Sequence, residues 1–155
     1  MKTYVIYHLN YCSALYANLP KTYLNKLQCV LNTCVRFIFD LPYGSDVKSY
    51  SKNVHFLPVH ARILYKLCTI VFKILNGSVP HYLQDKSSFR IPLDIGINLR
   101  STLNTMILDI PTIENTCAFK MAKAWNNLPF SIRNCHQFGA FKSALKTHFF
   151  DIEYG

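Results

Sequence analysis

At 155 residues, half of them apolar, the chain is long enough to bury a core, and we expect residues 1–155 to form a single domain. No apolar run approaches the roughly 20 residues that span a bilayer, so the sequence excludes a transmembrane helix and predicts no membrane partner. Its 17 Lys and Arg residues against 8 Asp and Glu residues give a net charge of +9, which favours a polyanion over a merely solvated basic surface.

Charged residues make up only 16% of the chain, against about 25% in an ordinary soluble domain. Part of the surface is therefore expected to lie against another molecule. The six cysteines include no Cys-x-x-Cys pair, and polar residues interrupt the N-terminal apolar stretch where a signal peptide needs a continuous one. We expect reduced, mostly buried thiols in a cytoplasmic or nuclear protein.

Apolar residues recur at three- and four-residue spacing through residues 1–85, which predicts a mainly α fold, a small domain of about four to six helices in all. In this first helical part, helices are expected at residues 4–17, 20–39 and 58–76, with shorter turns near 46–53 and 79–84. The pair Asn76-Gly77 should end the third helix, because glycine adopts the left-handed conformation of a C-terminal cap at little cost.

Residues 86–111 break the helical spacing, because Pro92, Gly96 and Pro111 interrupt it. We expect an extended connector there, with one or two short strands. A C-terminal helical part follows at residues 112–150, with one helix over 114–127. The apolar residues of its last helix are Phe138, Phe141, Leu145 and Phe149.

A leucine–proline pair occurs four times, at residues 19–20, 41–42, 57–58 and 128–129. Proline suits the first turn of a helix and moves the residue before it out of the helical conformation. The pairs at 19–20 and 57–58 are expected to place a leucine in the core and begin a helix. The last pair should end the helix of Trp125, the only tryptophan, whose spacing favours a core position over stacking on a nucleic-acid base.

The eight carboxylates are scattered, and the closest pair, Asp151 and Glu153, lies in a tail that we expect to fray. Two-metal phosphoryl transfer needs several carboxylates around ions about 4 Å apart, and no local grouping supplies them. The sequence has no glycine-rich phosphate loop, no His-Glu-x-x-His motif and no zinc-finger spacing. We expect no metal, no cofactor and no catalytic residue, although a Cys/His pair assembled by folding stays open.

Basic residues lie at helical spacing in three places, where a positive ridge can follow a phosphate backbone that is read by charge and not by base sequence. They are Arg62, Lys66 and Lys73 on the third predicted helix, Lys120 and Lys123 on the next, and Lys142 and Lys146 on the last. We hypothesise that these residues bind RNA or RNA–DNA hybrid without sequence preference. The alternative is a set of solvated helix faces.

Several short motifs occur in a specific order along the chain. They are Asn10-Tyr11-Cys12 with Leu15-Tyr16; Leu19-Pro20 with Leu24, Leu27-Gln28 and Arg36; Phe56-Leu57-Pro58-Val59 with Arg62-Ile63 and Tyr65-Lys66; Pro80 with Tyr82-Leu83; Leu99-Arg100-Ser101; Phe119; Trp125-Asn126 with Leu128-Pro129 and Ile132-Arg133; and Phe141-Lys142 with Leu145-Lys146. Together they resemble the C-terminal region of the reverse transcriptases of non-LTR retrotransposons, the LINE-like elements of the jockey type. The resemblance covers roughly residues 7–150.

The resemblance implies thumb and post-thumb helices, which follow the palm of an RNA-directed DNA polymerase. The endonuclease domain and the Asp-Asp polymerase motif would precede Met1, so no catalytic residue carries over, and the Cys/His zinc knuckle of some members is missing. We interpret the chain as a non-catalytic piece, a truncated or degenerate copy, that supports the reverse transcriptase core and contacts template-primer.

Two other classes of function stay open. The chain could be a helical interaction module that docks a protein partner, or a second copy of itself, through an exposed apolar face. It could also be a small cysteine-dependent enzyme, which would carry one unusually reactive thiol.

Overall fold

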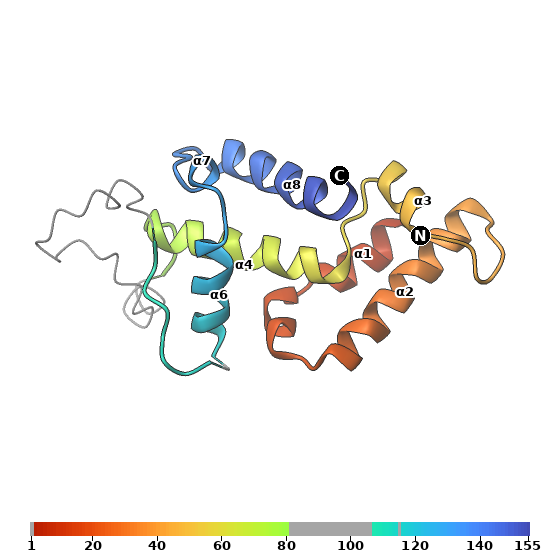
Figure 1. Cartoon of the computed structure of the whole chain (residues 1–155), viewed down its shortest axis with the longest axis horizontal. Helices are drawn as coiled ribbons and strands as arrows, with labels where there is room; N and C mark the ends of the chain where they lie inside the picture. The colour runs from red at the N-terminus through yellow and green to blue at the C-terminus, as the bar shows by residue number, and fades with distance from the viewer. Residues whose placement is uncertain (1, 81–106, 115) are drawn as a thin grey trace, which may run out of the picture. The chain divides into compact units, whose positions relative to one another are not determined.

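The computed structural model describes residues 2–80, 107–114 and 116–155. These residues form eight helical segments and no strand, which confirms the prediction of a mainly α protein (Figure 1). Five of the segments are longer than six residues, and the other three are short turns of helix. Most of the predicted connector at 86–111, with its strands, and the turn near 79–84 lie outside the described residues.

By their internal contacts the residues divide into two compact units. Unit 1 comprises Met1–Lys66 with Lys146–Gly155, and unit 2 comprises Leu67–Leu145. The boundaries fall inside two long helices, α4 (Val59–Leu75) and α8 (Phe138–Tyr154), so each unit contains part of both. The expectation of a single domain stays a prediction.

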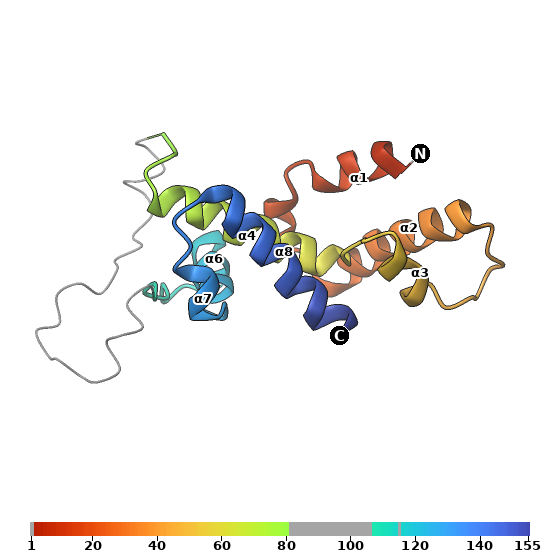
Figure 2. The same cartoon turned by 90° about the horizontal axis from the view of Figure 1, so that it is seen from above.

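Unit 1 begins with α1 (Lys2–Asn10) and a 3-10 helix, η1 (Ser13–Asn18), where the spacing predicted one helix over residues 4–17. That prediction was wrong, because Cys12 adopts a left-handed conformation with φ of 49° and turns the chain (Figure 2). The turn continues as a 3-10 helix, since the N–H of Leu15 donates to the carbonyl of Cys12 at 2.9 Å.

The remaining elements of unit 1 are α2 (Lys21–Phe39), α3 (Lys48–Asn53), the start of α4 and the end of α8. The helix predicted at 20–39 is therefore confirmed, and α3 falls within the turn predicted near 46–53. The buried apolar side chains of this unit are Leu31, Val35, Val47, Phe56, Leu57, Val59, Ala61, Ile63 and Phe149.

Three of the leucine–proline pairs begin helices, as the sequence predicted for the pairs at 19–20 and 57–58, and the third, at 128–129, also follows the end of α6 (Cys117–Asn126) as predicted. The carbonyls of Pro20, Pro58 and Pro129 accept the first helical hydrogen bonds of α2, α4 and α7 (Phe130–Arg133). The preceding leucines Leu57 and Leu128 are buried. Leu19 is 37% exposed, so its expected core position was wrong. It lies in the short link between η1 and α2, before the first residue of α2.

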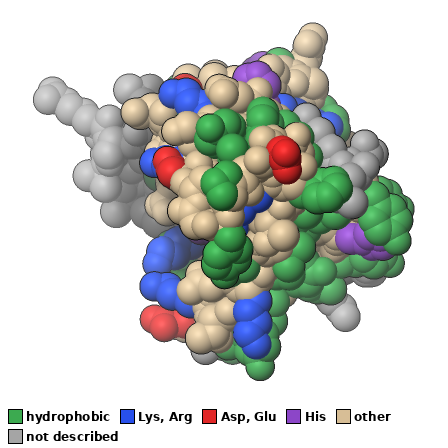
Figure 3. Space-filling model, turned by 90° about the vertical axis from the view of Figure 1, so that its right-hand side faces the viewer, with side chains coloured by type: hydrophobic (Ala, Val, Ile, Leu, Met, Phe, Trp, Pro, Cys, Tyr) green, Lys and Arg blue, Asp and Glu red, His purple; other side chains and the backbone are tan. Residues whose placement is uncertain are grey.

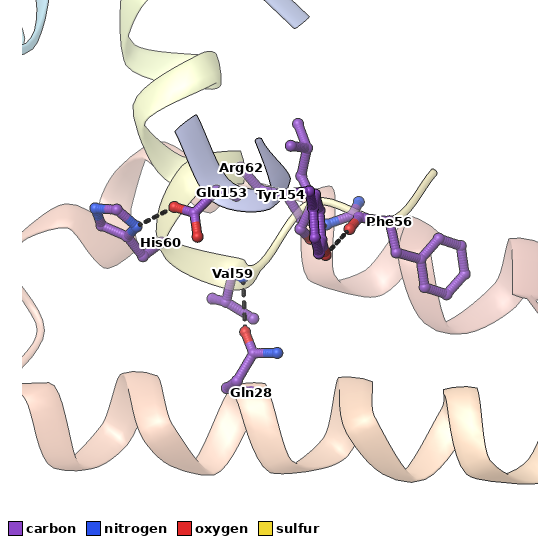
Figure 4. Close-up of polar contacts among 8 residues, drawn as sticks. Gln28, Phe56, Val59, His60, Arg62, Glu153 and Tyr154 are labelled. Carbon is purple, nitrogen blue, oxygen red and sulfur yellow. Dashed lines mark hydrogen bonds and ion pairs between the residues drawn. The ribbon is translucent and has the colours of Figure 1, made fainter. Parts of the chain in front are cut away.

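The C-terminal tail does not fray, because α8 continues to Tyr154 and its end is bonded to residues far away in the sequence (Figure 4). The hydroxyl of Tyr154 donates to the carbonyl of Phe56, and Lys52 Nζ donates to the carbonyl of Tyr154 at 2.9 Å. Glu153 lies 3.4 Å from His60. The expected fraying was therefore wrong, since these contacts hold the last turn within unit 1.

Unit 2 contains the rest of α4, α6 (Cys117–Asn126), α7 and the start of α8. The Oγ1 of Thr116 accepts from the N–H of Phe119 at 3.2 Å and caps α6. Trp125 is 1% exposed, and its ring centroid lies 5.8 Å from that of Phe141, which confirms the predicted core position of the tryptophan. Phe141 stacks in turn on Phe72 at 4.3 Å.

A side-chain hydrogen-bond pair and a helix cap fix the backbone of unit 2 in two further places. The amide of Asn126 makes a pair of hydrogen bonds with the backbone of Leu108, at 2.9 and 2.8 Å, which fixes the non-helical residues 107–111. Gly77 has φ of 64°, and the N–H groups of Gly77 and Ser78 donate to the carbonyls of Ile74 and Lys73. This is the glycine cap that Asn76-Gly77 predicted.

Candidate nucleic-acid interface

Arg62 differs from the exposed ridge residue that the sequence predicted. Its Nε donates to the carbonyl of Leu57 at 2.7 Å, and its Nη1 donates to Asn10 Oδ1 at 3.3 Å. The guanidinium also lies 5.6 Å from the ring centroid of Phe56. Burial lowers the pKa of Arg62, and the proximity of Tyr154 opposes that shift. The guanidinium is thus a half-buried, fixed charge.

A cavity of about 560 Å³ in unit 1 brings Arg62 together with two of the predicted lysines, Lys66 and Lys146. Lys66 follows Arg62 by one turn of α4, while Lys146 comes from α8. The complete lining is Ile6, Asn10, Ser13, Val54, His55, Phe56, Leu57, Arg62, Tyr65, Lys66 and Lys146. No Asp or Glu occurs among these described residues, so the cavity is positively charged.

The left-handed conformation of His55 shapes one wall of this cavity. His55 has φ of 55°, and it closes α3, because its N–H and that of Phe56 donate to the carbonyls of Lys52 and Ser51. The chain then turns into Leu57-Pro58 and α4. Tyr65 adds a neutral phenol to the lining of the cavity. Burial raises the pKa of this phenol, which favours its neutral, hydrogen-bonding form.

Lys73 and Lys142 form a second basic cluster, in unit 2, around an aromatic ring that sequence reasoning missed. Their Nζ atoms lie 5.2 and 5.4 Å from the ring centroid of Phe138. A cation over an aromatic face is attracted by the ring quadrupole. The four-residue spacing of Phe138 and Lys142 in one helix was the available signal.

The third basic pair, Lys120 and Lys123, lies on α6. Lys123 is exposed, with its Nζ 5.8 Å from the ring centroid of Phe119, while Lys120 is half-buried. The structure therefore groups the seven predicted residues differently from the sequence. Arg62, Lys66 and Lys146 belong to unit 1 and line its cavity. Lys73 and Lys142 belong to unit 2, where both lie beside Phe138.

The six cysteines are free thiols, but only Cys68 among them is buried, so the expectation of mostly buried thiols was wrong. Cys68 is fully buried, and desolvation raises the pKa of its thiol to about 12, against an ordinary value of 9. Cys135 and His136 both line a small cavity of about 130 Å³ in unit 2, where Cys135 Sγ donates to the carbonyl of Ser131 at 3.6 Å. Within residues 2–80, 107–114 and 116–155, no three His, Cys, Asp or Glu side chains are grouped to hold a metal ion.

Comparisons with protein-family models, with curated proteins and with solved structures found no match. Within the described part of the chain, every helix is too short or too polar to cross a bilayer.

Proposed function

We propose that this protein binds the phosphate backbone of RNA or RNA–DNA hybrid without catalysing a reaction, as the C-terminal region of a non-LTR reverse transcriptase would. The observation that carries the proposal is the cavity of unit 1, which gathers Arg62, Lys66 and Lys146 with no lining carboxylate. Three positive side chains around one hollow attract phosphate, and charge-assisted hydrogen bonds strengthen the contact.

The second cluster supports contact with a single strand. Phe138 is 38% exposed, and Lys73 and Lys142 lie beside its ring. Proteins that bind single strands without sequence preference combine lysines that follow the backbone with aromatic rings on which bases stack. Phe138 supplies the ring, and the two lysines supply the charge.

The test measures the affinity of the protein for a single-stranded RNA and for an RNA–DNA hybrid at low salt. The variant Lys66→Ala/Lys146→Ala removes two exposed cations from the cavity and leaves the half-buried Arg62 in place. We expect binding to weaken at least about tenfold for both ligands. The matched control, Lys21→Ala/Lys26→Ala, removes the same charge from exposed positions of α2 and should change affinity by less than about threefold. Equal losses in both variants would argue against a localised interface.

A second candidate, a helical interaction module, is favoured by a separate observation on α2. Tyr23, Val30 and Phe37 recur every seven residues and are 54%, 50% and 67% exposed. Hydrophobic side chains are also visible on the face drawn in Figure 3, with lysine and arginine between them. Seven-residue apolar spacing is typical of a helix that packs on another helix. Self-association in sedimentation experiments, lost in Val30→Glu and unaffected by RNA, would favour this candidate.

A further inference from the structure

We infer that the cavity of unit 1 is a nucleotide-binding pocket that takes a terminal phosphate, a phosphomonoester, together with its base. The inference rests on the proposed function in one respect, since it uses the same three cations, but it names a ligand that a simple backbone contact would not require. Arg62, Lys66 and Lys146 would hold the phosphate, and the apolar wall would cover the base.

The size and lining of the cavity fit one nucleotide. Its volume of about 560 Å³ lies within the roughly 300–1,000 Å³ of small-molecule sites. Such sites are mainly apolar with a few placed polar groups. Here Ile6, Val54 and Leu57 supply apolar surface, while Asn10 and Ser13 supply an amide and a hydroxyl.

The charge of the cavity favours the terminal phosphate of a nucleotide or nucleic-acid strand over a phosphate in the interior of a strand. A phosphomonoester carries about −1.5 to −2 charges at pH 7, whereas an internal phosphodiester carries one. The three cations of the cavity are matched by no carboxylate among its described lining residues. Doubly charged phosphate therefore gains more from this lining than a phosphodiester does.

Arg62 gives the phosphate site its fixed point. Two of its five N–H groups are used in the bonds to Leu57 and Asn10, which hold the guanidinium in place and leave donor capacity for an anion. Lys66 and Lys146 are exposed and flexible, so they can close on a phosphate from two helices. The fixed arginine orients the phosphate, and the two lysines add positive charge around it.

The experiment titrates the full chain with adenosine 5′-monophosphate and with adenosine at low salt, by calorimetry. We expect the monophosphate to bind at least about tenfold more tightly than adenosine, and Lys66→Ala/Lys146→Ala to remove that difference. The matched control Lys21→Ala/Lys26→Ala removes two exposed cations from α2, outside the cavity, and should change monophosphate affinity by less than about twofold. Circular dichroism is measured on both variants to check that they are folded.

Two outcomes would overturn the pocket: adenosine binding as tightly as its monophosphate, or an equal loss of monophosphate affinity in both double variants.

A short RNA with and without a 5′-phosphate then distinguishes the two sources of the ligand. Tighter binding of the phosphorylated RNA identifies a chain end, and equal binding identifies a free nucleotide, with the pocket upheld in both cases. RNA binding without monophosphate binding rejects the pocket alone, while monophosphate binding without RNA binding rejects only the proposed function.

Discussion

Gly77 and Gly139 both belong to unit 2, yet their backbones differ. Gly77 has φ of 64° at the end of α4, where an alanine side chain would meet the following carbonyl. Gly139 lies in the first turn of α8, and an added Cβ would have no atom within 4 Å. We expect Gly77→Ala to lower the free energy of unfolding by about 1 kcal/mol. Gly139→Ala should raise it by roughly 0.5 kcal/mol.

Urea unfolding followed by the fluorescence of Trp125 measures both variants, because this only tryptophan is buried in unit 2. Each glycine serves as the control for the other, since the same methyl group is added. A shift of the two midpoints in the same direction would contradict the assigned backbone conformations.

Cys68 provides a pH test at the same scale. Burial raises the pKa of the thiol from 9 to about 12, so the folded state favours the neutral form. The stability that this group contributes is complete below pH 9 and is lost as the pH rises from 9 towards 12. At neutral pH we expect alkylation to modify the exposed Cys12 and Cys29 but spare Cys68 until the protein unfolds.

Mass spectrometry of alkylated peptides measures these rates, with the urea-unfolded protein as control. Fast modification of Cys68 in the folded protein would contradict its burial. One thiol that reacts far faster than the exposed cysteines would instead support the cysteine-dependent enzyme.

Among the elements, the last turn of α8 depends most on distant partners. Tyr154→Phe removes the hydroxyl that donates to the carbonyl of Phe56 and leaves the ring in place. We expect it to lower the free energy of unfolding by about 1 kcal/mol, the usual net value of a hydrogen bond. Ile152→Ala, at a 63% exposed position in the same turn, should change it by less than about 0.5 kcal/mol. Urea unfolding followed by circular dichroism compares them, and equal effects would argue that the contact is not formed.

The sequence predicts those elements whose signals are local. Amphipathic spacing predicts α2, α4 and α6, and the prolines beside these helices and Gly77 after α4 mark where they begin or end. Each of these signals lies within the helix or next to it in the sequence. The break at Cys12 needs a non-glycine residue in a left-handed conformation, which has no sequence signature. The end of α8 was missed because Tyr154 and Phe56 lie 98 residues apart.

The same distinction applies to the candidate site. Helical spacing singled out every lysine and arginine of the two clusters. Arg62, Lys66 and Lys73 are separated by about whole turns of α4, and Lys142 and Lys146 by about one turn of α8. It could not show that Lys146 shares a cavity with Arg62 and Lys66, since that grouping depends on how α8 packs in unit 1. It also could not show that Arg62 is half-buried, because its partners Asn10 and Leu57 lie on other segments.

For the whole molecule, the net charge of +9 and the grouping of lysines make salt dependence the property that backbone binding must show. Affinity for a nucleic acid falls with salt in proportion to the number of phosphates that the protein neutralises. A docking module that binds through apolar surface would be nearly indifferent to salt.

The most direct measurement is the affinity for single-stranded RNA across a salt series, for the natural protein, Lys66→Ala/Lys146→Ala and Lys21→Ala/Lys26→Ala. We expect a negative slope of log affinity against log salt for the natural protein, shallower by about 0.7 for each phosphate contact that the cavity variant loses. The α2 control should keep the slope of the natural protein. An affinity that does not change with salt, or a cavity variant with an unchanged slope, would contradict phosphate binding by this surface.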